Sequence, residues 1–125
     1  MKEIGSEFQL GFKDLFGKRN NDLLEKKGIY LSSVRDCLVY LIKSLKLEGK
    51  KVLLPSYICE EVVKPFTNNN VKIFFFKINE DLSVNLKDLK NKISKYKTSV
   101  LIIIHYFGFI QKDISKIKNI CKKNK

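Results

Sequence analysis

Three short segments of this chain carry the side chains best suited to chemistry. The first is Ser33, Val34 and Arg35, at the expected start of a helix. Free backbone N–H groups and the positive end of the helix dipole favour an anion there, such as a phosphate. Arg35 opposes that dipole, so a bound anion would offset its cost; alternatively, Arg35 reaches solvent or Asp36, and the serine is only a helix cap.

The other two segments each follow an expected strand. Tyr57 and Cys59 come after the first strand, and His105 ends a later apolar run. Ligands of open parallel sheets bind outside the carboxyl ends of the strands, so both segments qualify as sites. The alternative for Tyr57 is a half-buried aromatic ring that covers the end of the sheet. His105 would need a positioned partner for acid–base chemistry, and without one it is a structural histidine.

The elements that must position these residues alternate between short apolar strands and amphipathic helices. This alternation predicts an α/β fold with an open, mainly parallel sheet and flanking helices. Residues 1–28 are expected to form an N-terminal arm, and 29–125 the α/β domain. The expected strands are 51–54, 71–76 and 100–105, and the expected helices begin near Ser32 or Ser33 and span 56–67, 86–96 and 112–123.

Two details of these elements are open to test. The strand at 71–76 is so continuously apolar that we expect no solvent-exposed face, and Pro65 is expected to kink or end its helix. Cys37 lies among apolar residues of the first helix, where we expect it to be a buried, hydrophobic thiol. The odd number of cysteines, 3, and the absence of a CxxC spacing argue against a disulfide framework and against a metal site.

The net charge of +12 raises the possibility of nucleic-acid binding. Only Arg19 and Arg35 are arginines, however, and direct base readout depends largely on bidentate arginine. The lysines of 112–125 lie opposite a helical stripe of isoleucines, which is typical of a solvated helix face. Nucleic acid is therefore not the expected partner.

Neither a membrane nor secretion is indicated by the sequence. The longest apolar run, 100–110, is well short of the roughly 20 residues that cross a bilayer. The N-terminal residues include two glutamates and no extended apolar core, so they do not form a secretory signal. We therefore expect no membrane partner and a cytoplasmic location.

Four segments, in this order and spacing, resemble the start of a known family. They read IGSEF (4–8), SSVRDCLVYL (32–41), KVLLPSYICEEVVKPF (51–66) and VLIIIHYFG (100–108). Together they resemble the DegT/DnrJ/EryC1/StrS sugar aminotransferases, which are fold-type I pyridoxal-phosphate enzymes. The resemblance covers almost the whole chain and implies the N-terminal part of the large domain of such an enzyme.

The resemblance also implies cofactor-binding residues. Ser33, Val34 and Arg35 fall on the family's Ser-Gly-Thr or Ser-Gly-Arg turn around the cofactor phosphate, with Val34 in place of glycine. Tyr57 and Cys59 match a Pro-Ser-aromatic turn whose last residue packs on the pyridine ring. His105 matches the family's His-x-x-Gly after a strand.

The implied reaction is transfer of an amino group to a keto-sugar bound to a nucleotide, with pyridoxal phosphate as cofactor. In the family, the aspartate that holds the pyridine nitrogen and the Schiff-base lysine come later than these segments. No lysine of this chain lies in that context, so no catalytic residue is assigned and the chain alone is expected to be inactive. Its nucleotide-sugar substrate would be met only in a complete enzyme.

Three functions remain open from the sequence. The chain is an N-terminal fragment completed by a downstream polypeptide or a homologous subunit, a small module that binds a phosphorylated ligand or a partner chain, or a basic nucleic-acid-binding protein. A fragment would leave sheet edges and helix faces uncovered. The first function therefore predicts that the isolated chain is oligomeric or poorly soluble.

Overall fold

The computed structural model describes Ile29 and residues 31–124. The chain divides into two units, Met1–Tyr30 and Leu31–Lys125, and every helix and strand below belongs to the second. The expected arm at 1–28 lies outside the described residues. Within the described part of the chain, no helix is both long enough and apolar enough to cross a membrane.

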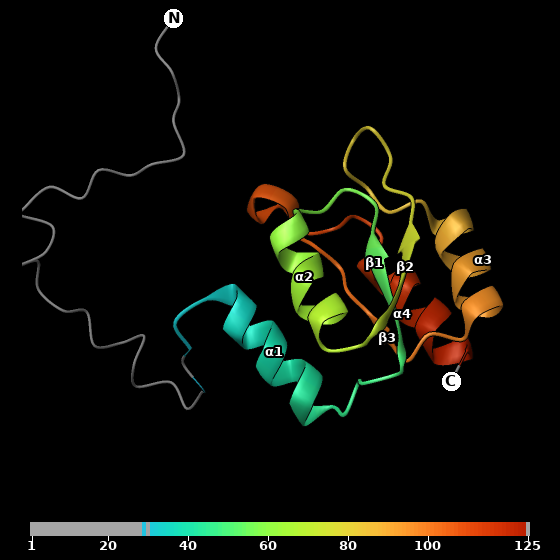
Figure 1. Ribbon diagram of the computed structural model, residues 1–125. Helices are drawn as coiled ribbons and strands as arrows, with labels where there is room; N and C mark the ends of the chain where they lie inside the picture. Colours follow the sequence, from blue (N-terminus) through green and yellow to red (C-terminus); the bar gives the residue numbers. More distant parts are fainter. Residues whose placement is uncertain (1–28, 30, 125) are drawn as a thin grey trace, which may run out of the picture. The chain divides into compact units, whose positions relative to one another are not determined.

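A three-stranded parallel sheet forms the centre of the second unit (Figure 1). The strands are β1 (Lys51–Pro55), β2 (Lys72–Phe76) and β3 (Val100–Leu101), in the order β2-β1-β3. Both neighbours run parallel to β1, which pairs Leu53 with Phe74 on one side and with Leu101 on the other. The predicted α/β class with an open parallel sheet is therefore confirmed.

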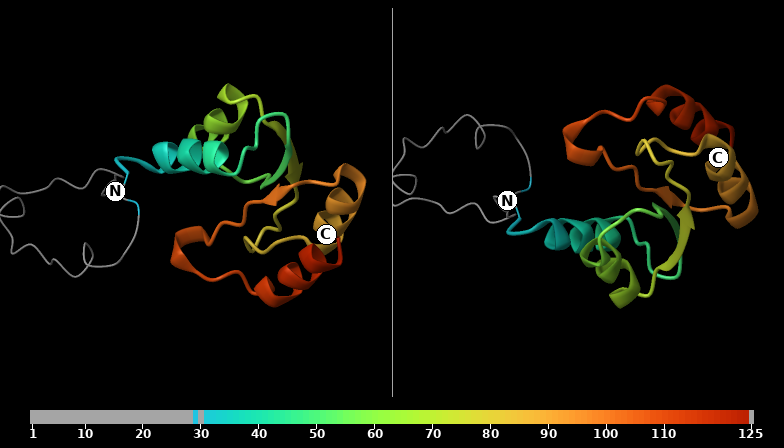
Figure 2. Two further views of the ribbon diagram at one scale, coloured as in Figure 1. Left: turned by 90° about the horizontal axis from the view of Figure 1, so that it is seen from below. Right: turned by 90° about the horizontal axis from the view of Figure 1, so that it is seen from above.

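Four α-helices cover the two faces of this sheet, and a short 3-10 helix, η3 (Tyr106–Gly108), follows β3. The helices are α1 (Val34–Ser44), α2 (Glu60–Asn68), α3 (Leu86–Tyr96) and α4 (Ile114–Lys123). Figure 2 shows α1 and α2 on one side of the sheet and α3 and α4 on the other. The unit thus has three layers, with the sheet in the middle.

Alternate side chains of β1 point into two separate hydrophobic cores, one on each face of the sheet. Val52 and Leu54 pack with Ile42 of α1 and Phe66 of α2, whereas Leu53 points to the opposite face. On that face the buried residues include Leu89 of α3 and Ile117 of α4. A central strand buried on both faces explains why 51–54 reads as a continuous apolar run.

The third strand is shorter than predicted. The sequence predicts a strand over 100–105, but β3 ends at Leu101, and its last ladder bond runs from the Ile102 N–H to the Leu53 carbonyl at 3.0 Å. The next β1 residue with its backbone groups toward β3 is Pro55, which has no N–H to donate. The ladder therefore stops, and the chain leaves the sheet toward His105.

Three further expectations are wrong in detail. The helix predicted at 56–67 begins only at Glu60, because the Ser56 N–H still bonds to Phe76 at 2.8 Å, and it continues past Pro65 to Asn68. Phe75 is 43% exposed, since β2 is an edge strand. Cys37 is exposed rather than buried, because the face of α1 that carries it does not point to the core.

Candidate functional site

Two of the three segments singled out in the sequence, the turn after β1 and the segment after β3, lie at the carboxyl edge of the sheet, whereas the third begins α1, beside α2 (Figure 1). An ion pair joins the first turn of α1 to the first turn of α2, with 2.7 Å between an Arg35 nitrogen and a Glu61 oxygen. The turn after β1 meets the segment after β3, because the Tyr106 hydroxyl donates to the Tyr57 carbonyl at 2.6 Å. The two tyrosine rings are also in contact, with centroids 5.5 Å apart.

At the start of α1, an aspartate takes the place that a bound anion would have. The Ser33 hydroxyl accepts the Asp36 N–H at 3.2 Å and caps the helix. The Asp36 carboxylate in turn accepts the hydroxyls of Ser33 at 2.7 Å and Ser32 at 3.0 Å. These hydrogen bonds, the one from Ser33 first, lower the pKa of Asp36 below its ordinary value.

Arg35 is held by a carboxylate as well. Glu61, which lies 26 residues away in sequence, binds the Arg35 guanidinium and also accepts a hydrogen bond from Lys64 at 2.6 Å. The pKa of Glu61 is lowered, first by Lys64 and then by Arg35. The sequence offered solvent or Asp36 as the alternatives for Arg35, and a partner this distant gives no signal in the pattern of a single sequence.

A hollow of about 340 Å³ between α1 and α2 includes Ser33, Arg35, Asp36 and Lys64 in its lining. The Ser33 hydroxyl and the Arg35 and Lys64 cations are donors of the types that hold a phosphate. Each of them, however, is engaged: the serine by Asp36, and both cations by Glu61. A phosphate at this turn would lie beside the Asp36 carboxylate, and Val34 stands where a glycine would allow close backbone approach. The turn as it stands does not fit the phosphate of pyridoxal phosphate.

The turn after β1 presents two exposed side chains. Tyr57 is 57% exposed, and its ring contacts the ring of Tyr106. It is therefore not a half-buried ring that covers the end of the sheet. Cys59 is the N-cap residue of α2, its side chain makes no capping hydrogen bond, and its thiol is exposed. Both side chains could meet a planar group laid over the carboxyl edge, because each has a free face toward solvent.

His105 has a structural partner. Its Nδ1 accepts the backbone N–H of Gln111 at 3.2 Å, which fastens the two ends of the loop that contains η3. The imidazole is exposed, and its neighbour Tyr106 is partly buried, which raises the pKa of the Tyr106 hydroxyl. This geometry supports the structural interpretation of His105 over that of an acid or a base.

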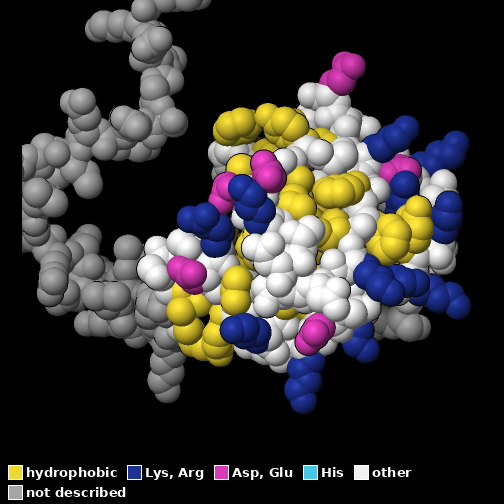
Figure 3. All heavy atoms as spheres, viewed as in Figure 1, with side chains coloured by type: hydrophobic (Ala, Val, Ile, Leu, Met, Phe, Trp, Pro, Cys, Tyr) yellow, Lys and Arg dark blue, Asp and Glu magenta, His cyan; other side chains and the backbone are white. Residues whose placement is uncertain are grey.

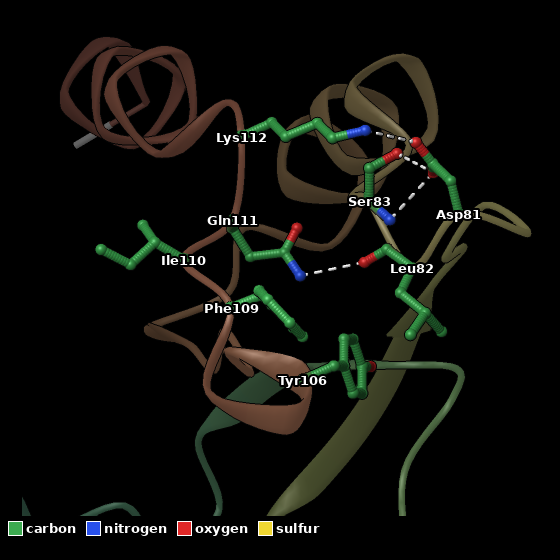
Figure 4. A pocket seen from close by; sticks show the side chains of 8 residues that line it. All are labelled: Asp81, Leu82, Ser83, Tyr106, Phe109, Ile110, Gln111 and Lys112. Carbon is green, nitrogen blue, oxygen red and sulfur yellow. Dashed lines mark hydrogen bonds and ion pairs between the residues drawn. The ribbon is translucent and has the colours of Figure 1, made fainter.

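A second hollow, of about 330 Å³, lies beside this loop and was not foreseen from the sequence (Figure 4). It brings Asp81 and Ser83, from the turn before α3, next to Gln111 and Lys112. Gln111 is the one buried polar residue among the described residues, at 6% exposure. A lone glutamine between two apolar segments gives no periodic signal in the sequence.

No cluster of three or more histidine, cysteine or acidic side chains suited to a metal ion occurs in the described part of the chain. In comparisons with known proteins, no family model matches the chain, and no curated protein matches it.

Proposed function

We propose that the chain is the N-terminal part of the large domain of a pyridoxal-phosphate-dependent sugar aminotransferase, completed by a second polypeptide that carries the later segments of that domain. In this proposal the chain is inactive alone. The cofactor and the nucleotide-sugar substrate belong to the completed enzyme, and the chain works in the cytoplasm.

The observation that carries this proposal is the contact between two of the three family-like segments, the turn after β1 and the segment after β3, at the carboxyl edge of a parallel sheet. Arg35 is tied to the first turn of α2, and Tyr57 is tied to Tyr106, although 49 residues separate the two tyrosines. The turn after β1 and the segment after β3 each resemble a cofactor turn of one family and share the edge where such sheets bind ligands, which supports a common origin with that family.

The need for a second polypeptide is supported by surface that this unit leaves uncovered. Val34 and Leu41 of α1 and its C-cap residue Leu45 are 69%, 45% and 54% exposed. They recur at helical spacing and form one stripe, which we call the α1 stripe, and Figure 3 shows hydrophobic side chains on this part of the surface. The sheet also has β2 and β3 at its two edges, where another strand could pair.

The chain's own residues leave the start of α1 closed to a phosphate. Ser33 and Arg35 are held by Asp36 and Glu61, so a phosphate could enter only if these carboxylates moved or were neutralised. The partner would therefore have to supply both the cofactor's covalent anchor and a group that displaces Asp36. That requirement is why we propose an inactive unit rather than a small enzyme.

The test is to read the transcript beyond codon 125 and to produce any encoded polypeptide together with this chain. We expect an apolar strand that ends in Glu-Asp and, further on, a Ser-x-x-Lys segment. The two polypeptides should then co-purify in a 1:1 complex that binds pyridoxal phosphate and takes an amino group from glutamate. As a control, a Leu41→Lys, Leu45→Lys double variant should fail to form the complex.

Two results would count against the proposal. One is a transcript without those segments, combined with a chain that stays monomeric and unfolds in a sharp cooperative transition. The other is a gel shift with DNA or RNA that weakens steeply with salt, which would point to the +12 charge as the functional feature instead.

A further inference from the structure

We infer that the hollow beside Gln111 is a binding site for a small, flat, neutral molecule that carries an N–H or O–H donor, such as an indole or a phenol. Its wall is built from two segments of this unit, 81–83 and 106–112, without a contribution from a partner. The inference is therefore independent of the proposed aminotransferase origin.

The orientation of the Gln111 amide is fixed by its surroundings. Its nitrogen donates to the Leu82 carbonyl at 2.9 Å and to the Ile104 carbonyl at 3.0 Å. Since both neighbours can only accept, the NH₂ group must face them and the oxygen must face away. Figure 4 shows the amide nitrogen directed at Leu82 and the oxygen on the opposite side, toward the Lys112 side chain.

The Gln111 oxygen is left without a hydrogen bond from the residues that the structure describes. Among the described residues, every buried side-chain N or O atom has a hydrogen-bond partner. Because the Gln111 oxygen has none, it is not fully buried and remains accessible to solvent. An acceptor on a residue that is 6% exposed, still open to the hollow, is a specific anchor for a donor. A ligand that lacks the donor would cover this oxygen and leave it unpaired.

The rest of the wall selects an apolar body. Phe109 and Ile110 also line the hollow and are 78% and 74% exposed, and Figure 4 shows Phe109 extending toward Tyr106 and Leu82, with Ile110 directed away from them. A flat molecule between Phe109 and the side chains of Leu82 and Tyr106 would remove apolar surface from water on both of its faces. The wall therefore favours an aromatic ring over a chain of polar groups.

The charges at the rim favour a neutral ligand. Lys112 and Asp81 form an ion pair, with 3.1 Å between the ammonium nitrogen and a carboxylate oxygen. The Asp81 carboxylate also accepts the Ser83 N–H and the Ser83 hydroxyl. With cation and anion matched in this way, the rim offers no net charge to an acid or an amine.

The probe pair is indole and benzothiophene, which have nearly the same shape, although only indole has an N–H donor. Each would be titrated into the ¹⁵N-labelled full chain, and the shifts of the Gln111 side-chain NH₂ and the Ile110 amide followed by NMR. We expect indole to bind about tenfold more tightly than benzothiophene, since one hydrogen bond to a buried acceptor distinguishes them. Equal affinities, or no saturable shifts with indole, would overturn the inference.

A matched pair of exposed phenylalanines locates the site. Phe109→Ala removes part of the wall and should weaken indole binding about tenfold. Phe107→Ala removes an equally exposed ring that does not line the hollow, and it should leave binding unchanged. Neither side chain is buried, so both variants should fold. Equal effects of the two substitutions would place the binding elsewhere and overturn the inference.

Discussion

Helices α1 and α3 begin in the same way. Each has 11 residues, and each follows a cap whose side-chain oxygen accepts the N–H of an aspartate three positions on. In α1 the Asp36 N–H donates to Ser33 at 3.2 Å, and in α3 the Asp88 N–H donates to Asn85 at 3.0 Å. The local sequence signals that start a helix are thus equally good in both.

The two helices differ in what surrounds them. In α3, Leu89 and Ile93 are buried in the core, and the Asp88 carboxylate accepts the Lys77 N–H at 2.8 Å, which ties the helix to the end of β2. In α1, only Ile42 is buried, while the α1 stripe faces solvent. Capping determines where a helix starts, but the neighbouring elements determine how much of its apolar surface is buried.

The largest effect that separates the two helices should come from their leucines. Leu89→Ala, at a fully buried position, is expected to lower the free energy of unfolding by about 2–5 kcal/mol, because it leaves a cavity. Leu41→Ala, in the α1 stripe, should change it by no more than about 0.5 kcal/mol in the monomer. Urea unfolding of both variants measures this, and a large loss for Leu41→Ala would mean that the stripe already packs within the chain.

The sequence alone predicted the elements well where local signals and the apolar pattern agreed. The helix expected at 86–96 is found as α3 (Leu86–Tyr96), and the first helix starts after its serine cap. What the sequence could not show depends on contacts between distant residues. The burial of one side of α1 is decided by α2, and Arg35 is engaged by Glu61, 26 residues away.

The candidate site likewise has features that the sequence predicts and features that depend on contacts between distant residues. The shared carboxyl edge could be foreseen, since parallel strands place their ends together. The early end of β3 could also have been foreseen from Pro55, once the register with Leu53 was known. By contrast, the role of Asp36 as an internal anion and the open acceptor of Gln111 depend on side-chain geometry.

The second-largest effect should be on the association of the chain, either with itself or with a partner. Leu41→Lys together with Leu45→Lys should weaken any complex formed through the α1 stripe at least a hundredfold, because two charges would be buried against an apolar partner. Sedimentation velocity of the full chain over a range of concentrations measures the change for self-association, and co-purification measures it for a partner.

The control for that variant must add the same charge elsewhere. Asn91→Lys together with Asn119→Lys does so on the exposed faces of α3 and α4. If this control dissociates the complex equally, added charge rather than the α1 stripe is responsible, and the contrast between α1 and α3 would lose its functional meaning.

A smaller effect is expected from the caps. Ser33→Ala and Asn85→Ala should each cost about 1 kcal/mol of unfolding free energy, as is usual for a lost helix cap. Asn85→Ala should cost more of the two, because Asn85 also donates to the Asn79 side chain at 3.1 Å and because α3 is joined to the core. Chemical denaturation ranks them; a larger loss for Ser33→Ala would show that α1 is held more firmly than its exposed stripe indicates.

The smallest effect concerns the charge of Asp36. Its pKa is lowered mainly by the Ser33 hydroxyl, so Ser33→Ala should raise that pKa toward the ordinary value of 3.8. A lowered pKa contributes stability above the pKa of the unfolded chain, and the contribution is lost as the pH falls through the folded pKa. The stability of the variant should therefore depend less on pH between about 4 and the folded pKa than the stability of the wild type does.

A ¹³C NMR titration of the carboxyl groups measures the Asp36 pKa directly. Asp81 is the internal control, since Ser83 and Lys112 hold its pKa at about 2 and neither contacts α1. An unchanged Asp36 pKa in Ser33→Ala would mean that Ser32 alone holds the carboxylate, and the turn would then be less closed to a phosphate than its hydrogen bonds indicate.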